Sequence, residues 1–417
     1  MIKKITERLK YWGQLLLLPV YWLSFLVPRN KRIWLFGSTF GRRFADNPRY
    51  LYLYIDQHRE RLGIRPIWIS HDEKIVKMLN DNGCEAYMYH SLKGILFALI
   101  GKVYLFDNYS KDINFWLSGG AVKINLWHGI PLKKIQHDNV FDRFRHPKND
   151  WERFKNFPRN ISDEKPHHYV LTTSVNLKKI FASAFQTKNV LVAGYPRNEV
   201  LVSDRVKNLY STEEKRDRKK ITYFLKKDMT ASGEETKRKM VFYMPTFRQS
   251  ETLFFENFDK KDFQRFLNDN NILFCIKLHP KSKLNSEFKN IQSENIMVID
   301  KDADPYVFLK LADVLITDYS SIYFDYLLLD RPMIFFDYDL KEYLSDSRKM
   351  YFDYDKFTPG RKAESYVELK KALSDALYKK DAYADERKKI RNKFFSQGRQ
   401  KSSLKLIKMI LENIGGL

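Results

Sequence analysis

The chain has 417 residues, a length that favours two or three domains over one. Apolar residues make up 44% and aromatic residues 15%, which excludes an intrinsically disordered protein. The 74 Lys and Arg residues against 51 Asp and Glu give a net charge of +23, so we expect an anionic partner: nucleic acid, a phospholipid surface or a phosphorylated substrate. Two cysteines do not indicate a disulfide framework, and we expect a reducing cytoplasm.

The first 30 residues combine basic flanks with an apolar, aromatic stretch from Tyr11 to Pro28. A signal peptide is not indicated, because no small-residue cleavage site is present and basic residues follow. The stretch is marginal for a membrane-spanning helix because it contains Gln14 and Pro19. Basic flanks with interfacial aromatic residues indicate instead that residues 1–30 associate with the membrane surface. The alternatives are a true span and a helix packed on the protein's own core.

Two series of short apolar runs alternate with helical patterns along the rest of the chain. We expect strands at 31–38, 65–70, 102–107, 121–127, 168–174 and 188–194, and then at 241–245, 272–279, 296–300, 312–318 and 332–337. Near-continuous apolar strands that alternate with helices are typical of parallel sheets covered on both faces. The sequence therefore predicts an α/β fold with two Rossmann-like, doubly wound domains.

The domain boundaries follow from the same patterns. Residues 31–215 form the expected first domain and residues 216–389 the second, and the charged, weakly patterned region 205–239 indicates the interdomain region. The tail from residue 364 onward looks helical, and we expect a C-terminal helix within 390–417 to pack back on the first domain.

Five expected strands end in polar or cationic residues. His128 follows the strand 121–127, and the next residues include Gly129, which lets backbone approach a ligand, and Pro131, which fixes the turn. The other four strand ends are 195–198, 245–248, 279–280 and 317–321. Ligands of open parallel sheets sit beyond the carboxyl ends of the strands, so the pattern predicts an anion-binding cleft between the domains.

Each of these residues also has an ordinary structural explanation. Ser320 and Ser321 would begin a helix, whose N-terminal N–H groups bind phosphate, but simple capping explains them equally well. His128 is suited to general-base chemistry at neutral pH, whereas a buried structural histidine is the alternative. Lys277 and Arg248 could neutralise a transferring phosphoryl group or could be surface charges.

Several other chemistries lack their sequence signatures. No HExxH, CxxC, clustered carboxylate motif or DxD triplet indicates a metal site. No P-loop or GxGxxG motif is present, which argues against an NTP-driven motor and a nicotinamide enzyme, and no GxSxG nucleophile elbow is present either. We expect no cofactor, although a loosely bound divalent cation stays compatible with the sequence.

The ordered set NLWHGIPLKK, AGYPRNE, MPTFR, IKLHP and TDYSSIYFDYLLLDRPMIFF resembles the CDP-glycerol glycerophosphotransferases, which build teichoic acids and related polyol-phosphate polymers in bacteria. The early stretch LFGSTFGRRFADNPRYLY resembles the opening segment of the same family, and the resemblance covers residues 31–398. It implies two Rossmann-like domains that face a cleft, the glycosyltransferase B arrangement, with a membrane-attached N-terminal part.

The resemblance also implies the reaction and its place. Glycerol phosphate from CDP-glycerol, or ribitol phosphate from CDP-ribitol, would move to a hydroxyl of an acceptor, and CMP would leave. The implied acceptor is an undecaprenyl-diphosphate-linked saccharide or polyol phosphate. The enzyme would be a peripheral protein at the cytoplasmic face of the bacterial cell membrane and would bind its anionic surface, with no nucleic-acid partner.

By the same resemblance, His128 matches the first family histidine, the general base, and His279 matches the second, which stabilises the diphosphate or the leaving CMP. The positions that line the donor site are Gly129, Ile130, Pro131, Leu132, Arg197, Thr246, Phe247, Lys277, Leu278, Ser320, Ser321 and Asp325, and we add Arg248 because of its charge. Two features depart from the family pattern. Ile130 replaces the usual Thr or Val, and residues 396–403 lack the Asp of a C-terminal motif and displace its Arg.

Four alternatives stay open. The short N-terminal region favours a primase or a short polymerase over a large polymerase, and nothing in the sequence separates CDP-glycerol from CDP-ribitol. A glycosyltransferase of the same fold could instead use a nucleotide sugar to make cell-wall or capsule glycan. A nucleic-acid-binding protein is suggested by the charge alone, and no RNP, helix-turn-helix or zinc-finger signature supports it.

Overall fold

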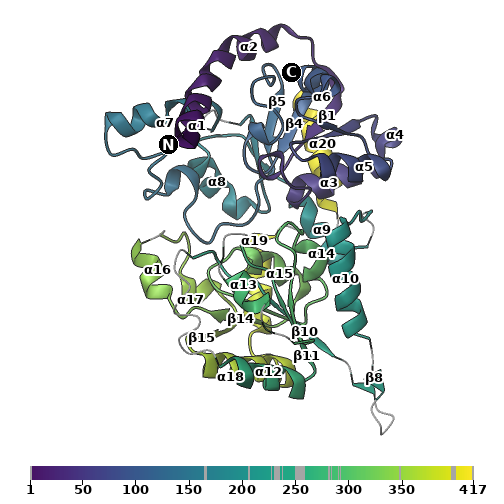
Figure 1. Cartoon of the computed structure of the whole chain (residues 1–417), viewed down its shortest axis with the longest axis vertical. Coiled ribbons are helices and arrows are strands. Elements are labelled where there is room, and N and C mark those ends of the chain that lie inside the picture. The colour runs from purple at the N-terminus through teal and green to yellow at the C-terminus, as the bar shows by residue number, and fades with distance from the viewer. Residues whose placement is uncertain are drawn as a thin grey trace. The chain divides into compact units, whose positions relative to one another are not determined.

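The structure is a computed structural model. It describes residues 2–163, 167–204, 207–226, 228–229, 235–236, 238–248, 259–279, 282, 284–289, 291, 293–346, 349–395 and 401–415. The chain forms two compact units (Figure 1): unit 1 comprises Met1–His128, Ile135–Leu209 and Phe395–Leu417, and unit 2 comprises Gly129–Lys134 and Tyr210–Phe394. The chain thus enters unit 2 at Tyr210, before the expected boundary at 215/216, and the segment Gly129–Lys134 lies in unit 2 although we expected it in the first domain.

Unit 1 contains a seven-stranded sheet in the order β3-β2-β1-β4-β5-β6-β7, and all of its strand pairs are parallel. Its strands are β1 (Asn30–Phe36), β2 (Arg65–Ser70), β3 (Ala86–Met88), β4 (Gly101–Phe106), β5 (Val122–Asn125), β6 (Tyr169–Thr172) and β7 (Val190–Val192). The central strands carry Ile, Val, Leu, Phe and Trp on both faces and are buried on both, as expected for a sheet that is covered by helices on either side.

The helices of unit 1 connect and cover these strands. They are α1 (Ile2–Gly13), α2 (Leu18–Leu23), α3 (Asp46–Gln57), α4 (Arg59–Leu62), α5 (Glu73–Asp81), α6 (Leu92–Ile100), α7 (Asp150–Asp163), α8 (Lys178–Ala184), α9 (Pro196–Val202) and α20 (Ser402–Gly415). Short 3₁₀ helices are η1 (Gln14–Leu17), η2 (Ser24–Leu26), η3 (Thr39–Gly41), η4 (Ser110–Asp112), η5 (Gln136–Asp138) and η6 (Val175–Leu177).

Unit 2 contains a six-stranded parallel sheet in the order β12-β11-β10-β13-β14-β15 and a separate antiparallel pair, β8 with β9. The strands are β8 (Asp228–Met229), β9 (Glu235–Thr236), β10 (Lys239–Tyr243), β11 (Ile272–Ile276), β12 (Ile296–Val298), β13 (Val314–Thr317), β14 (Met333–Phe336) and β15 (Arg361–Ala363). All eleven expected strands are confirmed. The strands β3, β8, β9 and β15 were not expected, because they are short and, β3 apart, consist mainly of polar residues.

The helices of unit 2 lie around this sheet. They are α10 (Thr212–Phe224), α12 (Lys260–Asp269), α13 (Leu284–Lys289), α14 (Tyr306–Leu309), α15 (Ile322–Tyr326), α16 (Leu340–Asp346), α17 (Tyr354–Phe357), α18 (Tyr366–Tyr378) and α19 (Ala384–Phe394), with a 3₁₀ turn η7 (Leu327–Leu329). Helices are therefore the main structure of the tail, as expected, with α18 and α19 in unit 2 and α20 in unit 1.

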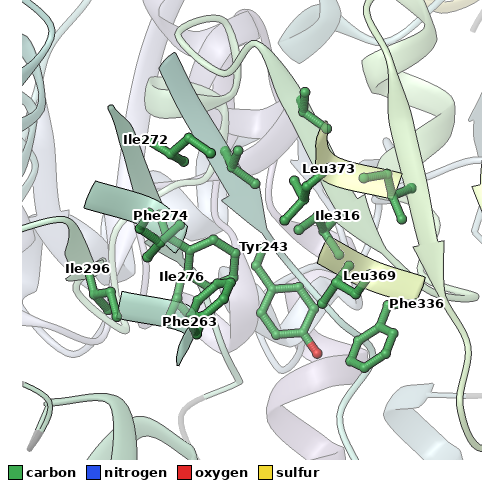
Figure 2. Close-up of a cluster of buried hydrophobic side chains, with 14 of the residues drawn as sticks. Tyr243, Phe263, Ile272, Phe274, Ile276, Ile296, Ile316, Phe336, Leu369 and Leu373 are labelled. Atoms are coloured by element: carbon green, nitrogen blue, oxygen red, sulfur yellow. The ribbon is translucent and has the colours of Figure 1, made fainter. Parts of the chain in front are cut away.

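Figure 2 shows the core on one face of the unit 2 sheet, where side chains of β10, β11 and β13 meet those of α12 and α18. Phe274 and Ile276 of β11 pack there with Phe263 of α12, and Leu369 of α18 covers Ile316 of β13. Truncation of a buried aromatic residue to alanine typically costs about 3–5 kcal/mol, so this cluster holds the strand ends of the sheet in place.

One interpretation of the sequence was wrong. Residues 205–239 do not form a weakly patterned interdomain region throughout, because 212–224 are the helix α10. A capping box between Ser211 and Glu214 starts it, and its buried face carries Glu214, Asp217 and Ile221. Since two of these three buried residues are acidic, apolar periodicity could not reveal the helix.

Candidate active site

In each unit the strand order reverses at one switch point, beyond which ligands of open parallel sheets bind. In unit 2, β10 is followed by β11 and β12 on one side and by β13 on the other, so the switch point lies between β10 and β13. In unit 1, the equivalent point lies between β1 and β4. Each unit therefore offers its own half-site, and the predicted residues fall around both.

Asp318 joins the two loops at the switch point of unit 2. Its buried carboxylate accepts hydrogen bonds from the backbone N–H of Thr246 at 2.9 Å, from the hydroxyl of Thr246 at 2.8 Å and from the backbone N–H of Ser320 at 2.9 Å. Sequence reasoning quoted Asp318 in the TDYSS motif but did not select it. The carboxylate fixes the ends of β10 and β13 relative to each other, which positions two predicted donor-site residues.

The expected helix at Ser320 is shorter than the pattern suggested. The α-helix α15 has five residues and continues as the 3₁₀ turn η7. Ser321 occupies the N-cap position, but its side chain makes no capping hydrogen bond. Capping therefore does not explain the Ser321 hydroxyl, while so short a helix adds little dipole to an anion site. Ser320 and Ser321 are both half-buried.

Arg248 lies between two carboxylates. Its guanidinium donates to Asp318 at 2.8 Å through one terminal nitrogen and to Asp339 at 2.8 Å through the other, and its Nε donates to Asp339 at 2.5 Å. Burial by itself lowers the pKa of Arg248, but the two carboxylates outweigh it and raise the pKa above its usual value. Because one cation faces two anions, no surplus positive charge is left to attract a ligand. Through these contacts Arg248 ties together the loops after β10, β13 and β14.

The segment Gly129–Lys134 attaches to unit 2 through its backbone and its apolar side chains. Ile130 and Leu132 are fully buried, the N–H of Tyr351 donates to the Leu132 carbonyl at 2.8 Å, and Lys133 forms an antiparallel bridge with Met350. The predicted donor-site residues Ile130, Pro131 and Leu132 thus anchor the segment, and Gly129 has a φ of +153°.

Lys133 is a cation of this segment that sequence reasoning missed. Its ammonium donates to the hydroxyl of Tyr343 at 3.1 Å and lies over the stacked rings of Tyr319 and Tyr343, 5.5 and 5.2 Å from their centroids. The hydroxyl of Tyr319 donates to Asp339. The motif NLWHGIPLKK ends in two lysines, which could have indicated a cation here. A single sequence does not show which of the two turns toward the switch point.

Lys277 and His279, predicted to face one side of β11, differ in exposure. The Lys277 ammonium is buried and donates to the carbonyls of Asp300 and Lys301, at 2.7 Å each. His279 is exposed, and its ring centroid lies 4.5 Å from that of Phe247. Leu278, between them, belongs to the apolar core. At the end of β11, His279 is therefore the predicted residue at the surface.

Two buried acids of α10 brace the loop that Lys277 contacts. The carboxylate of Asp217 accepts the N–H of Asp300 at 2.9 Å, and that of Glu214 accepts the N–H of Asp304 at 2.9 Å. Asp304 in turn accepts the backbone N–H of Tyr306. The hydroxyl of Tyr306 donates to Asp325 at 2.5 Å. Asp325 is completely buried, so its described contact is with the protein's own Tyr306.

His128 stands at the carboxyl end of β5 in unit 1, and its imidazole is exposed. Its Nδ1 lies 3.1 Å from the backbone carbonyl oxygen of Asp107. A carbonyl oxygen only accepts hydrogen bonds, so Nδ1 carries the proton in the neutral ring and Nε2 is the nitrogen that can accept one. The preceding residue, Trp127, has a φ of +51°, a left-handed conformation that is uncommon for a tryptophan.

Two buried carboxylates lie at the switch point of unit 1. Asp107 accepts the hydroxyl of Ser38 at 2.6 Å and the N–H of Thr39 at 2.9 Å, which joins the ends of β1 and β4. Asp112 accepts the N–H of Phe40 at 2.9 Å. Burial, together with the neighbouring Asp107, raises the pKa of Asp112 well above its usual range. Sequence reasoning did not select either residue.

Arg197 is buried and acts within unit 1. Its guanidinium donates to both oxygens of Asp46, at 2.8 and 2.9 Å, and its N–H donates to the side chain of Asn47 at 3.2 Å. Asn47 in turn donates to the Trp127 carbonyl at 2.8 Å, one residue before His128. The AGYPRNE and ADNP motifs thus meet behind the histidine and position it.

Among the residues that the structure describes, no group of three or more His, Cys, Asp and Glu side chains is arranged to hold a metal ion. The C-terminal motif discussed for residues 396–403 lies mostly outside the described residues, as does Pro280 of the IKLHP motif.

Two parallel α/β units, each with polar residues gathered at a topological switch point, define the class: a two-domain α/β protein with a glycosyltransferase-B-like fold. The wall teichoic acid polymerase TagF has this fold, with a TM-score of 0.71, 22% sequence identity and coverage of 100% of this chain and 99% of that one.

The sequence is more specific than the fold. Residues 20–412 match the CDP-Glycerol:Poly(glycerophosphate) glycerophosphotransferase family, and the chain belongs to that family. It is 28% identical to a teichoic acid poly(glycerol phosphate) polymerase of Bacillus spizizenii, over 83% of this chain and 84% of that protein. It is 27% identical to a teichoic acid glycerol-phosphate transferase of Staphylococcus aureus, over 88% and 89%. The protein is accordingly an enzyme, a CDP-glycerol glycerophosphotransferase of teichoic acid biosynthesis.

Proposed function

We propose that the protein transfers glycerol phosphate from CDP-glycerol to a hydroxyl of an undecaprenyl-diphosphate-linked acceptor at the cytoplasmic face of the bacterial membrane, with His128 as the general base. The observation that carries this proposal is the hydrogen bond from His128 Nδ1 to the Asp107 carbonyl, which leaves Nε2 on an exposed ring to take a proton.

In the proposed reaction, His128 Nε2 removes the proton of the acceptor hydroxyl as its oxygen attacks the phosphorus that bears glycerol. A new P–O bond forms, the bond from that phosphorus to the bridging oxygen breaks, and CMP leaves with the electron pair. Such a transfer depends on in-line positioning and on stabilisation of charge, and no covalent intermediate is needed.

The residues proposed to bind the donor in unit 2 are the surface-lying members of the predicted set. His279 and Phe247 follow β11 and β10, and the Ser320 and Ser321 hydroxyls follow β13. An exposed imidazole can donate a hydrogen bond to a diphosphate oxygen or to the leaving CMP. The buried residues Arg248, Lys277 and Asp325 would shape this surface from behind, because their described contacts are with protein groups.

The test is release of CMP from a panel of donors: CDP-glycerol, CDP-ribitol and several nucleotide sugars. A lipid-linked disaccharide and its glycerol-phosphate-primed form serve as the two acceptors. We expect release from CDP-glycerol, and the preferred acceptor then separates a primase from a polymerase. Release from nucleotide sugars alone would refute the proposed chemistry, because no CDP-polyol would then be used.

CDP-ribitol is the second candidate donor, since it differs from CDP-glycerol only in the length of the polyol. The two relatives named above are glycerol-phosphate enzymes, which favours CDP-glycerol. Faster CMP release from CDP-ribitol with the same acceptors would reverse this preference.

We further propose that residues 1–28 attach the enzyme to the membrane surface. Within the described part of the chain, no helix combines the length and the apolar character needed to cross a bilayer. The segment forms the short helices α1, η1, α2 and η2, which leave large apolar side chains exposed. Short helices with exposed aromatic residues and basic flanks suit a segment that lies in the interface.

A further inference from the structure

The side chains of Trp127 and His128 do not follow the geometry of the strand that leads to them. In an extended chain, successive side chains point to opposite faces of the sheet. The rings of Trp127 and His128 instead lie against each other, with centroids 3.9 Å apart and planes inclined by 32°. The backbone leaves the extended conformation at Trp127, where φ is +51°, and this turn brings the two neighbouring rings together.

The left-handed conformation of Trp127 costs free energy. It is unfavourable for any residue with a Cβ atom, because the Cβ comes too close to the following carbonyl oxygen. A residue other than glycine keeps such a conformation only where the surrounding structure fixes it. We therefore looked for contacts that hold the peptide groups on both sides of Trp127.

Two buried asparagines hold these peptide groups. Asn125, the last residue of β5, accepts the N–H of Trp127 through its side-chain oxygen at 2.8 Å. Asn47 of α3 donates to the carbonyl of Trp127 at 2.8 Å and to that of Leu126 at 3.2 Å. Both asparagine side chains are completely buried, so water does not compete for these contacts.

The other end of each amide is bonded to a further element of unit 1. The Asn125 side chain donates to the carbonyl of Asn108 at 2.9 Å, and that of Asn47 accepts the N–H of Arg197 at 3.2 Å. Asn108 directly follows Asp107, whose carbonyl accepts the hydrogen bond from His128 Nδ1. Asn125 thus connects the segment that orients the imidazole to the peptide group that precedes it.

The indole of Trp127 is itself fixed in the fold. It is only 6% exposed, and the ring of Phe185, which follows α8, meets it edge to face at 4.9 Å between centroids. The imidazole of His128, in contrast, is exposed. An exposed side chain is free to change rotamer unless its neighbours prevent it, and here one face of the imidazole rests on a buried indole.

We propose that Asn125 and Trp127 are positioning residues for the general base. Asn125 holds Trp127 in its left-handed conformation, and the indole of Trp127 holds the imidazole of His128 with Nε2 turned toward the acceptor. The proposal rests on the proposed function, in which Nε2 takes the proton of the acceptor hydroxyl. It adds two residues that act on the reaction only through His128.

This arrangement affects the chemical step. Proton removal needs a narrow range of distance and angle between Nε2 and the hydroxyl, and an imidazole that turns freely is rarely in that range. Once Nε2 has taken the proton, the imidazolium also lies against the electron-rich face of the indole, which attracts a cation. Neither effect concerns donor binding, so loss of either residue should lower kcat and leave KM for CDP-glycerol unchanged.

The first measurement is the NMR signal of His128 in the full chain without substrate. Histidines labelled with ¹³C at Cε1 give nine signals, and the one that is lost in His128→Gln belongs to His128. The ring current of an indole shifts a proton above its face upfield. We expect this shift in the wild type, and a return downfield in Asn125→Ala and in Trp127→Leu. A His128 signal with no upfield shift in the wild type would overturn the proposal, whatever the stability of the variants.

The second measurement is the steady-state rate of CMP release from CDP-glycerol. We expect Asn125→Ala and Trp127→Leu to lose about 10²-fold in kcat, which is the effect of displacing a reacting group by about 1 Å, with an unchanged KM. Trp127→Phe keeps an aromatic face and should recover part of the loss. A kcat like that of the wild type in Trp127→Leu would overturn the proposal, and so would a loss that appears in KM alone.

Two matched controls separate positioning from stability. Asn80 is another asparagine of unit 1 that holds a peptide group, because its side chain accepts the N–H of Ala86 at 3.1 Å and donates to the carbonyl of Ala86 at 3.2 Å. Trp68 is a buried tryptophan of β2. We expect Asn80→Ala and Trp68→Phe to lower the midpoint of thermal unfolding but to keep kcat and the His128 signal of the wild type. An equal loss of kcat in these controls would overturn the proposal, since any destabilisation of unit 1 would then have the same effect.

Failure of the proposed reaction gives a different pattern of results. Full turnover by His128→Ala would remove His128 as the base, and the positioning role would fall with it. An inactive His128→Ala together with a fully active Trp127→Leu would keep the base and overturn the positioning role alone.

Discussion

The half-sites of the two units differ in how the predicted residues are used. In unit 1, His128 keeps an exposed ring, and buried residues such as Arg197 act behind it. In unit 2, the predicted cations Arg248 and Lys277 are held by carboxylates and carbonyls of the protein, and His279 stands at the surface. A cation at a strand end is therefore not by itself an anion-binding group, because the fold can use its charge to hold loops together.

The largest effect is expected at His128, the residue of unit 1 to which we assign a direct role in the reaction. His128→Ala removes the proposed base, and loss of a general base typically lowers turnover by about 10²–10⁴-fold. We expect that loss in CMP release from CDP-glycerol, with unchanged thermal unfolding because the ring is exposed. His90→Ala, at another exposed histidine of unit 1, is the control. Turnover near that of the wild type would take His128 out of the base role.

Arg248 of unit 2 tests whether a buried cation at a strand end stabilises the fold and does not bind the donor. Arg248→Ala leaves the buried Asp318 and the largely buried Asp339 without their cation, and breaking such a pair typically costs about 3–5 kcal/mol of stability. Arg248→Lys should not restore it, since an ammonium cannot reproduce the forked contacts. Urea unfolding measures the loss, and Arg265→Ala on the exposed side of α12 is the control. A stable variant with a weaker affinity for CDP-glycerol would instead make Arg248 a donor ligand.

The contact between α9 and the C-terminal helix α20 gives a prediction about how the free energy of unfolding depends on pH. The N–H of Ser403 in α20 donates to Glu199 of α9, and burial raises the pKa of Glu199 to about 7. The folded state therefore binds the proton more tightly than the unfolded state. The stability that this provides is present below pH 4.5 and is lost as the pH rises to about 7.

Glu199→Gln removes this titration. We expect the variant to match the wild type near pH 4 and to exceed it near pH 8 by at most roughly 3 kcal/mol in the free energy of unfolding. Urea unfolding at the two pH values measures the difference, and Glu213→Gln at an exposed position is the control. A variant that is less stable than the wild type at pH 8 would mean that the hydrogen bond outweighs the cost of burying the charge.

Lys277 gives the smallest effect. Lys277→Met keeps the apolar stem but loses two charge-assisted hydrogen bonds to backbone carbonyls, and we expect a cost of about 2 kcal/mol in the free energy of unfolding. Because Asp217 holds the same loop, Asp217→Asn should be non-additive with it in a double-mutant cycle. Strict additivity would argue that the loop is not one braced unit and that Lys277 acts elsewhere.

Much of the fold was predictable because it depends on local pattern. Apolar runs such as 272–276 and 314–317 became buried parallel strands, since only an extended, doubly covered segment buries every side chain. The helix α10 was not predictable in this way, because its buried face carries Glu214 and Asp217, which are satisfied by backbone groups of the loop at Asp300 and Asp304.

The candidate site was predictable in its positions and less so in its roles. The motifs placed His128, His279, Ser320 and Ser321 at strand ends, and the structure brings each to the carboxyl edge of its sheet. Exposure could not be read from the motifs, because it depends on partners that are distant in sequence. Asp339, for example, lies 91 residues from Arg248.

By itself, the sequence determined the two α/β domains, the strand ends that carry chemistry, the family and the basic, aromatic N-terminus. Only the tertiary structure decided which charges are used internally and which apolar residues are left outside. It buried Arg197, Arg248 and Lys277 against partners from other loops, and it left large apolar side chains between Leu9 and Leu26 exposed. The physical reason is that strand and helix patterns are local, whereas pairing and exposure depend on the distant segments that the fold brings together.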